Sequence, residues 1–266
     1  MHESEMHMDF MIAYFRGAIV KAIVIITCIS AISVSNAQSV TLEFSSPQRQ
    51  STVSAYQLPG AASRPAVLVM SGAKGYKAAE YSRLAASLNS SGIDVLLIDY
   101  LSDADFAAID NADSASARIA YYSERMAEWS ATIRSVLSEI RKQPRYQSKI
   151  GLLGISLGAM PTTTVGVNNP NVAAMALVDG GFPANFRTHI DSVPPLILVW
   201  GGGDRVFPRS TAMSLSNLAR RLGSSAELLI YNGEGHAFFL QDGNANATNA
   251  NAKIANFFAT QLTGQR

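Results

Sequence analysis

Short, continuous runs of apolar residues recur along the chain from residue 65 onward. Such runs are typical of parallel β-strands, because helices cover both faces of a parallel sheet and leave no face for polar residues. A final strand of more mixed composition is expected near the end of the chain. The predicted strands are 66–70, 95–98, 150–153, 173–178, 196–200 and 226–231.

Segments with helical spacing of apolar residues separate these strands. Gly92 and Gly223 follow two of them, at the position where glycine commonly ends a helix. Because strands and helices alternate, we expect right-handed βαβ units and a mostly parallel sheet with helices on both faces. The predicted helices are 78–91, 119–142, 210–222 and 252–262.

Two other segments depart from this alternation. Residues 40–44 and 51–58 alternate apolar and polar positions as half-buried antiparallel strands do, with Pro47 and Gln48 between them, and they predict an opening hairpin. Residues 242–251 are rich in Asn, Ala and Gly, and we expect them to form a surface loop.

One pentapeptide carries the strongest chemical signal in the chain. Gly154-Ile155-Ser156-Leu157-Gly158 directly follows a predicted strand and precedes a segment that can start a helix. This arrangement is typical of a nucleophile elbow, in which a serine projects from a tight turn and the two glycines let neighbouring backbones pass closely. The pattern therefore predicts a serine nucleophile at position 156.

Two further residues complete a candidate catalytic triad. A serine hydroxyl needs a base that takes its proton and an acid that orients the base. His236 and Asp204 both follow predicted strands, so a parallel sheet brings them to the edge that carries Ser156, and the chain order Ser, Asp, His is that of α/β-hydrolases. Asp179, after another strand, is the rival acid. The non-catalytic alternatives are Asp204 as a helix cap and His236 as a buried structural histidine.

Two backbone N–H groups are expected to bind the oxyanion formed when serine attacks a carbonyl. One belongs to the residue after the nucleophile, Leu157, and the other to the loop after the third strand. That loop, 71–75, is short and carries two glycines, which lets its backbone turn inward. Ala73 is the predicted second donor.

Together these motifs resemble the dienelactone hydrolase family of the α/β-hydrolase superfamily, over about residues 65–262. The resemblance implies a compact eight-stranded α/β-hydrolase fold without a large cap domain, acting on small esters or lactones without a cofactor. The matching segments are 67–72, 99–100, 154–158, 204–208 and 235–239.

The chain departs from the family pattern at three positions. Ser156 stands where the members that open dienelactones have a cysteine nucleophile. Gly72 and Leu240 lie in the regions where those members have an acidic residue that controls the nucleophile and an arginine that holds the substrate carboxylate. We therefore expect a less anionic acyl substrate than a dienelactone.

Four aromatic residues fall near the predicted crevice, in loops or at strand ends. Tyr76, Tyr100, Phe182 and Phe238 are expected either to line an acyl pocket or to pack in the core. The acidic, alanine-rich stretch 103–123 is expected to be either a mobile flap over the site or a surface excursion.

Residues 1–37 are predicted to be a signal peptide. Arg16 and Lys21 precede an apolar run at 22–34, and small residues follow at 35–37, so cleavage is expected before Gln38. The run is shorter than the roughly 20 residues of a membrane span, so a retained anchor is the weaker alternative. The exported domain, 38–266, is then expected to be periplasmic or extracellular, with no stable membrane insertion.

The composition excludes several other classes of function. The only cysteine, Cys28, lies in the signal segment, so a cysteine nucleophile is excluded. Only His189 and His236 lie beyond that segment, and we predict no metal site. The formal net charge is +1 with no basic block, so nucleic acid is not an expected partner.

The sequence thus predicts an exported serine hydrolase that cleaves a small carboxylic ester or lactone through Ser156, His236 and Asp204. The first alternative is a non-catalytic binding protein with the α/β-hydrolase fold, in which the triad is blocked or misaligned. An acyl transferase or a peptidase shares the nucleophile and is the second alternative.

Overall fold

The computed structural model describes residues 37–45, 50–60 and 63–264. The predicted signal peptide, apart from its last residue, lies outside the described residues, as do Pro47 and Gln48 of the hairpin turn. Within the described ranges, no helix combines the length and the apolar character needed to cross a membrane.

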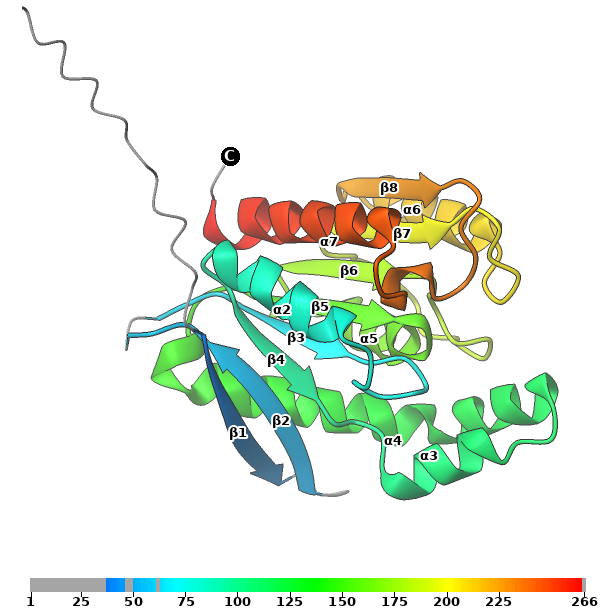
Figure 1. Cartoon of the computed structure of the whole chain (residues 1–266), viewed down its shortest axis with the longest axis horizontal. Helices are drawn as coiled ribbons and strands as arrows, with labels where there is room; N and C mark the ends of the chain where they lie inside the picture. The colour runs from blue at the N-terminus through cyan, green and yellow to red at the C-terminus, as the bar shows by residue number, and fades with distance from the viewer. Residues whose placement is uncertain (1–36, 46–49, 61–62, 265–266) are drawn as a thin grey trace, which may run out of the picture. The chain divides into compact units, whose positions relative to one another are not determined.

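An eight-stranded sheet organises the described residues, in the order β1-β2-β4-β3-β5-β6-β7-β8 (Figure 1). The first two strands form the predicted antiparallel hairpin, and β2 pairs antiparallel with β4, whereas all other pairs are parallel. The mostly parallel sheet of eight strands is confirmed. The strands are β1 (Gln38–Ser45), β2 (Gln50–Gln57), β3 (Ala66–Met70), β4 (Asp94–Ile98), β5 (Ile150–Ile155), β6 (Ala174–Val178), β7 (Leu196–Gly201) and β8 (Ala226–Tyr231).

Helices cover both faces of this sheet (Figure 1). The α-helices are α2 (Glu80–Ser90), α3 (Asp103–Asp110), α4 (Ala115–Lys142), α5 (Ala159–Gly166), α6 (Arg209–Arg221) and α7 (Ala245–Phe258). The short helical turns are the 3₁₀ segments η1 (Pro144–Tyr146), η2 (Ser156–Gly158) and η3 (Phe238–Leu240) and the π-helical segment η4 (Ala259–Thr263).

The alternation of side chains along each strand sorts the core into two layers. In β3, Leu68 packs in the cluster that contains Trp129 of α4, whereas Val67 packs with Leu84 of α2 and Ile254 of α7. Successive residues of a strand point to opposite faces, so every central strand must be apolar on both sides. This is why the buried strands are continuous apolar runs in the sequence.

The structure corrects one predicted loop. Residues 242–251 were expected to be irregular, but α7 begins at Ala245. The side chain of Asn244 accepts hydrogen bonds from the N–H groups of Asn246 and Ala247, and so caps the helix. The alanines between the asparagines favour helix, and buried Ala247 and Ala250 pack the first turns.

Helix α3 is a second difference, because the sequence pattern did not predict it. The Ser102 hydroxyl accepts a hydrogen bond from the N–H of Asp105, and the Asp105 carboxylate accepts one from the N–H of Ser102, which makes a capping box. Ser114 caps α4 in a similar way, so this helix begins at Ala115 rather than at 119. The segment predicted as a flap or surface excursion is therefore mostly helical.

The N-cap of α7 can be tested by substitution. Asn244→Ala removes the acceptor for two backbone N–H groups and is expected to lower the free energy of unfolding by about 1 kcal/mol. Asn244→Ser keeps a capping oxygen and should lose clearly less. Chemical denaturation of both variants measures the difference, and equal losses would contradict the capping role.

Candidate active site

Ser156 lies in a tight turn between the end of β5 and α5. Its φ of 53° is in the left-handed region, which a non-glycine residue rarely adopts. The flanking glycines are required by close packing: a Cβ on Gly158 would lie 2.5 Å from the carbonyl oxygen of Ser71, and one on Gly154 would lie 2.6 Å from the Cα of Ala159. The turn therefore holds the serine in a strained conformation, as expected of a nucleophile elbow.

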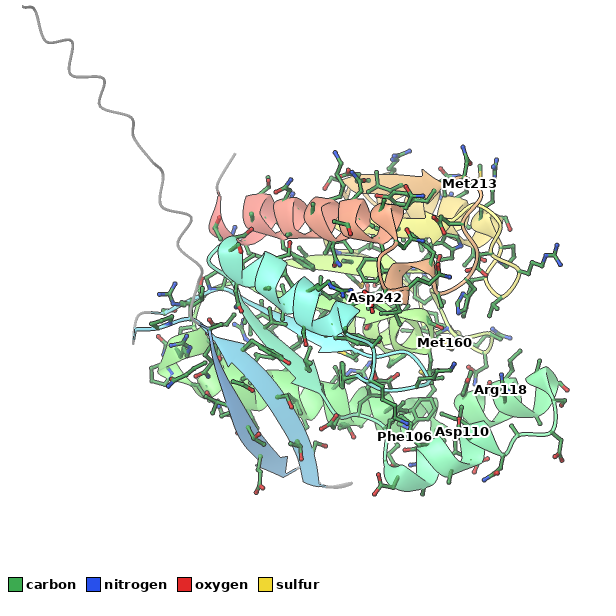
Figure 2. All side chains as sticks on the ribbon, viewed as in Figure 1. Phe106, Asp110, Arg118, Met160, Met213 and Asp242 are labelled. Carbon is green, nitrogen blue, oxygen red and sulfur yellow. The ribbon has the colours of Figure 1, made fainter. Side chains whose placement is uncertain are left out.

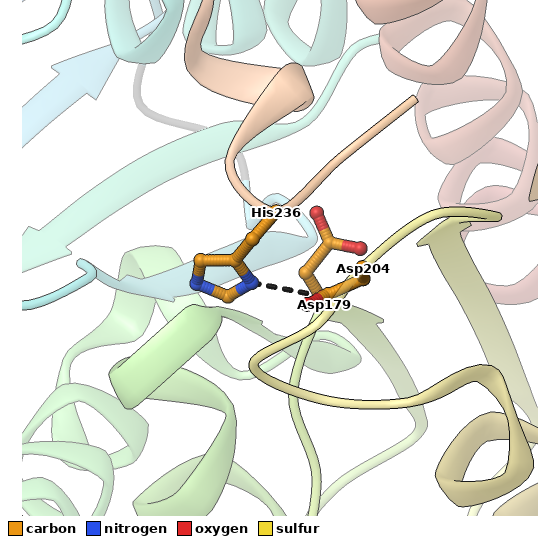
Figure 3. A group of neighbouring side chains, drawn as sticks. All are labelled: Asp179, Asp204 and His236. Carbon is orange, nitrogen blue, oxygen red and sulfur yellow. Dashed lines mark hydrogen bonds and ion pairs between the residues drawn. The ribbon is translucent and has the colours of Figure 1, made fainter. Parts of the chain in front are cut away.

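The three predicted triad residues form a continuous chain of hydrogen bonds. The Ser156 Oγ lies 2.9 Å from the Nε2 of His236, and the Nδ1 of His236 lies 2.9 Å from the Oδ2 of Asp204 (Figure 3 draws the second bond). A carboxylate can only accept, so Nδ1 carries a proton, and Nε2 of the neutral ring is then free to accept the serine proton.

Asp204 is held in this orientation by the backbone around it. Its side chain is fully buried, and its Oδ1 accepts hydrogen bonds from the N–H groups of Val206 at 2.7 Å and Phe207 at 2.9 Å. The ring of Phe207 also stacks on the imidazole of His236, with centroids 5.9 Å apart. Since Oδ1 is occupied, Oδ2 is left to fix the histidine.

Asp179, the rival acid, lies beside this pair but forms no hydrogen bond to His236 in the described part of the chain. Its Oδ1 accepts from the N–H of Gly201 at 2.8 Å, and its buried Oδ2 accepts no hydrogen bond of good geometry among the described residues, although the N–H of Ala237 faces the carboxyl. Burial raises the pKa of Asp179 to about 7. The carboxyl that contacts the imidazole is that of Asp204.

These three side chains are also the one group of potential metal ligands found among the described residues. One ligand atom from each of Asp179, Asp204 and His236 lies within 4.8 Å of the others (Figure 3). The Nδ1 of His236 and the Oδ2 of Asp204 are engaged with each other. A metal ion here would have to break that bond, and the absence of a metal site stays a prediction.

The two predicted oxyanion donors, Ala73 and Leu157, line the same cavity as Ser156 and His236. The loop that carries Ala73 is braced on both sides. The hydroxyl of Tyr100 donates to the carbonyl oxygen of Ser71 at 2.8 Å, and the N–H of Gly72 donates to a second tyrosine hydroxyl, that of Tyr81. This bracing holds the loop next to the elbow.

The structure places the four predicted acyl-pocket aromatics outside the cavity lining. Tyr76 and Tyr100 lie against the loop after β3, where the Tyr76 hydroxyl approaches the carbonyl oxygen of Val69 at 2.6 Å. Phe238 is completely buried in the core beneath α7, and Phe182 packs on Phe186 with centroids 4.5 Å apart. The two tyrosine hydroxyls thus bond to backbone carbonyls and the two phenylalanine rings pack on other side chains, as expected if these residues stabilise the fold rather than line an acyl pocket.

The cavity in front of Ser156 has a volume of about 570 Å³, which suits a small ligand. Its lining is mainly apolar and contains no acidic residue among the described residues. Sequence reasoning missed most of this lining, since it comes from loops and helix ends. The apolar side chains include Ile119, Tyr122, Met160, Val206, Phe207 and Leu240, and the cations are Lys74, Lys77 and Arg118.

The first turns of α4 form one wall of this cavity. We call it the α4 wall; it consists of Ala115, Arg118, Ile119 and Tyr122. Figure 2 labels Arg118 on this helix and Met160, a second lining residue, on α5. The segment 103–123, whose role the sequence left open, therefore contributes directly to the site.

A buried carboxylate attaches the α4 wall to α3. Asp105 accepts hydrogen bonds from the hydroxyl of Tyr121 at 2.7 Å and from Nε of Arg125 at 2.9 Å, both on α4. Burial opposes its ionisation, but these bonds and those from Ser102 lower the pKa of Asp105 to about 2. The Asp105 carboxylate, which joins α3 to α4, thus stays charged at neutral pH.

The sheet and the elbow define an α/β-hydrolase with a serine in the position of the nucleophile. The sequence model of the dienelactone hydrolase family matches residues 53–262, and the chain belongs to this family. The protein is thus a hydrolase of the serine type. No curated protein sequence matches it.

Several solved structures share this fold. A dienelactone hydrolase from Anabaena variabilis has a TM-score of 0.64 at 17% identity, over 85% of this chain and 99% of that chain. A dienelactone hydrolase-like promiscuous phosphotriesterase from metagenomic libraries has a TM-score of 0.71 at 18% identity, over 85% and 98%. A Pyrococcus horikoshii acylaminoacyl peptidase has a TM-score of 0.65 at 13% identity, over 85% of this chain and 42% of that one. At such identities the likeness shows the fold.

The raised pKa of Asp179 predicts a pH-dependent stability. The folded chain keeps this proton up to about pH 7, whereas the unfolded chain releases it near 3.8. The folded state therefore loses stability as the pH rises between these values. Asp179→Asn removes this penalty, so its melting temperature is expected to exceed that of the parent at pH 8.5, with a difference that shrinks towards pH 4.5.

Thermal unfolding followed by circular dichroism measures this difference. Asp113→Asn, at an exposed position, is the matched control and should leave the melting temperature close to that of the parent at both pH values. A loss of stability in Asp179→Asn that is equal at every pH would contradict the predicted titration.

Proposed function

We propose that the protein is an exported hydrolase of small carboxylic esters or lactones that works through Ser156, His236 and Asp204. The observation that carries this proposal is the unbroken hydrogen-bond chain from Ser156 to Asp204, with the serine at the wall of an open, mainly apolar cavity. A non-catalytic binding protein would be expected to have a blocked or misaligned triad, so the geometry favours catalysis.

The reaction begins when His236 takes the proton of the Ser156 hydroxyl while Oγ attacks the carbonyl carbon. The N–H groups of Ala73 and Leu157 bind the oxygen as it becomes negative. Asp204 stabilises the imidazolium, which then gives its proton to the leaving alcohol. Water next attacks the acyl-enzyme with His236 as base; the bond between the acyl carbon and Ser156 Oγ breaks, His236 returns the proton to Oγ, and the acid product leaves.

The cavity supports substrates that are partly apolar and not cationic. Ile119 and Val206 line it and are exposed by 50% and 62%, which gives it an apolar rim. Its three charged lining residues, Lys74, Lys77 and Arg118, are all positive. The acyl and alcohol parts of a small ester can rest on the apolar wall without meeting a carboxylate.

Export is the second part of the proposal and rests on the sequence of residues 1–37. N-terminal sequencing of the protein recovered from the periplasmic or culture fraction is expected to begin at Gln38. Recovery of uncleaved protein from the cytoplasm alone would contradict export and leave the catalytic proposal intact.

Substitution of the triad gives the main test. Ser156→Ala, His236→Ala and the double variant are each expected to lose about 10⁴- to 10⁶-fold in kcat/KM for p-nitrophenyl esters, because triad members act as a unit. A fluorophosphonate probe is expected to label the parent protein and not Ser156→Ala.

The control is Ser210→Ala, on α6 and outside the lining of the cavity, which should retain the parent activity and labelling. Multiplicative losses in the double variant would contradict a shared role of Ser156 and His236. Labelling that persists in Ser156→Ala would place the nucleophile elsewhere.

The charge of the lining predicts a selectivity. A neutral p-nitrophenyl ester is expected to have a higher kcat/KM than an isosteric p-nitrophenyl ester that carries a quaternary ammonium group, by about tenfold or more. Replacing Lys74, Lys77 and Arg118 together by Gln should reduce this preference. Equal rates for the two esters in the parent protein would contradict the proposed role of the cations.

A further inference from the structure

We propose that Asp179 is a second carboxyl group that acts on His236 and strengthens it as a base when Asp179 is ionised. This makes Asp179 a positioning residue, acting through the imidazole rather than on the substrate. The inference rests on the proposed function, because it concerns the base of the same triad.

The position of Asp179 supports this role. It follows β6 with a φ of 46°, and only 1% of its surface is exposed. The N–H of Gly201 holds its Oδ1, and the N–H of Ala237 also faces the carboxyl, while the buried Oδ2 accepts no hydrogen bond of good geometry in the described structure. One of its oxygens lies within 4.8 Å of one imidazole nitrogen of His236 and of one carboxylate oxygen of Asp204.

A purely structural role does not require a carboxylic acid here. The bond from Gly201 needs only an acceptor, and an amide oxygen supplies one equally well. Asparagine also tolerates the left-handed backbone as well as aspartate does. What aspartate adds at position 179 is a group that can ionise, and its burial makes that ionisation costly.

Among the described residues, four groups face the Asp179 carboxyl, and the imidazole of His236 is one of them. They are Asp204 from the loop after β7, His236 from the loop after β8, and the N–H groups of Gly201 and Ala237. Burial raises the pKa of Asp179 to about 7, so it gains its charge near neutral pH. A second negative charge next to the ring favours the imidazolium that forms during proton transfer.

Asp179→Asn tests this inference, because asparagine imitates the protonated acid and cannot ionise. The ratio of parent to variant kcat for a p-nitrophenyl ester is expected to grow about tenfold between pH 5.5 and pH 8.5, because only the parent gains a second negative charge beside the ring. KM should be similar in the two proteins. A ratio that is the same at both pH values would overturn the proposal.

Removal of the main acid gives a second readout. In Asp204→Asn, Asp179 is the remaining carboxyl near the ring, so adding Asp179→Asn is expected to lower kcat about tenfold further at pH 8.5. Circular dichroism checks that all variants are folded. Equal kcat values in the single and double variants would show that Asp179 is only structural.

A third measurement needs no substitution at position 179 and no activity. The imidazole C–H resonance of His236, assigned by its loss in His236→Ala, is followed by NMR as the pH rises in the full-length parent protein. Two titration steps are expected, one from the ring and one from Asp179. A single step would overturn the coupling. Absence of ester hydrolysis and of Ser156 labelling in the parent would instead contradict the proposed function.

Discussion

The hydrogen bond between Asp204 and His236 is the interaction on which the chemistry of this site depends. It fixes the proton on Nδ1, and thereby leaves Nε2 as the only nitrogen that can accept from Ser156. The carboxylate cannot turn away, because its other oxygen is held by the N–H groups of Val206 and Phe207. Burial strengthens these bonds by keeping water out. The tautomer and orientation of His236 are therefore fixed before a substrate binds.

The parallel sheet brings Ser156, Asp204 and His236 together. Ser156 and His236 are 80 positions apart in the chain, and Asp204 and His236 are 32 apart, but each follows a parallel strand. Because the carboxyl ends of parallel strands share one edge, a few residues after β5, β7 and β8 are enough to place them within bonding distance. The strain at Ser156 is borne by this scaffold, whose glycines allow the elbow to lie against the loop after β3.

The parts of the structure that were predictable from sequence are those with a local cause. Apolar runs located the central strands, and the spacing around Ser156 located the elbow. The positions of the aromatic side chains were less predictable. The orientation of Tyr100, for example, depends on a hydrogen bond to the carbonyl oxygen of Ser71, which is distant in the sequence. Helix α7 begins where it does because Asn244 caps it, and α3 forms with Ser102 as its cap. Both caps lie in polar, alanine-rich sequence, where they were not recognised. The lining of the cavity depends on how loops and helix ends pack together.

The α4 wall is joined to the protein differently from the triad. Asp105 holds it through Tyr121 and Arg125, and none of these bonds involves a strand end that carries Ser156, Asp204 or His236. Two separate parts of the structure thus carry the two roles. The α4 wall contacts the acyl or alcohol group, and the triad transfers the protons. Substitutions in α3 and the first turns of α4 can therefore change which molecules enter without altering the reaction, so selectivity can diverge here while the chemistry is inherited unchanged.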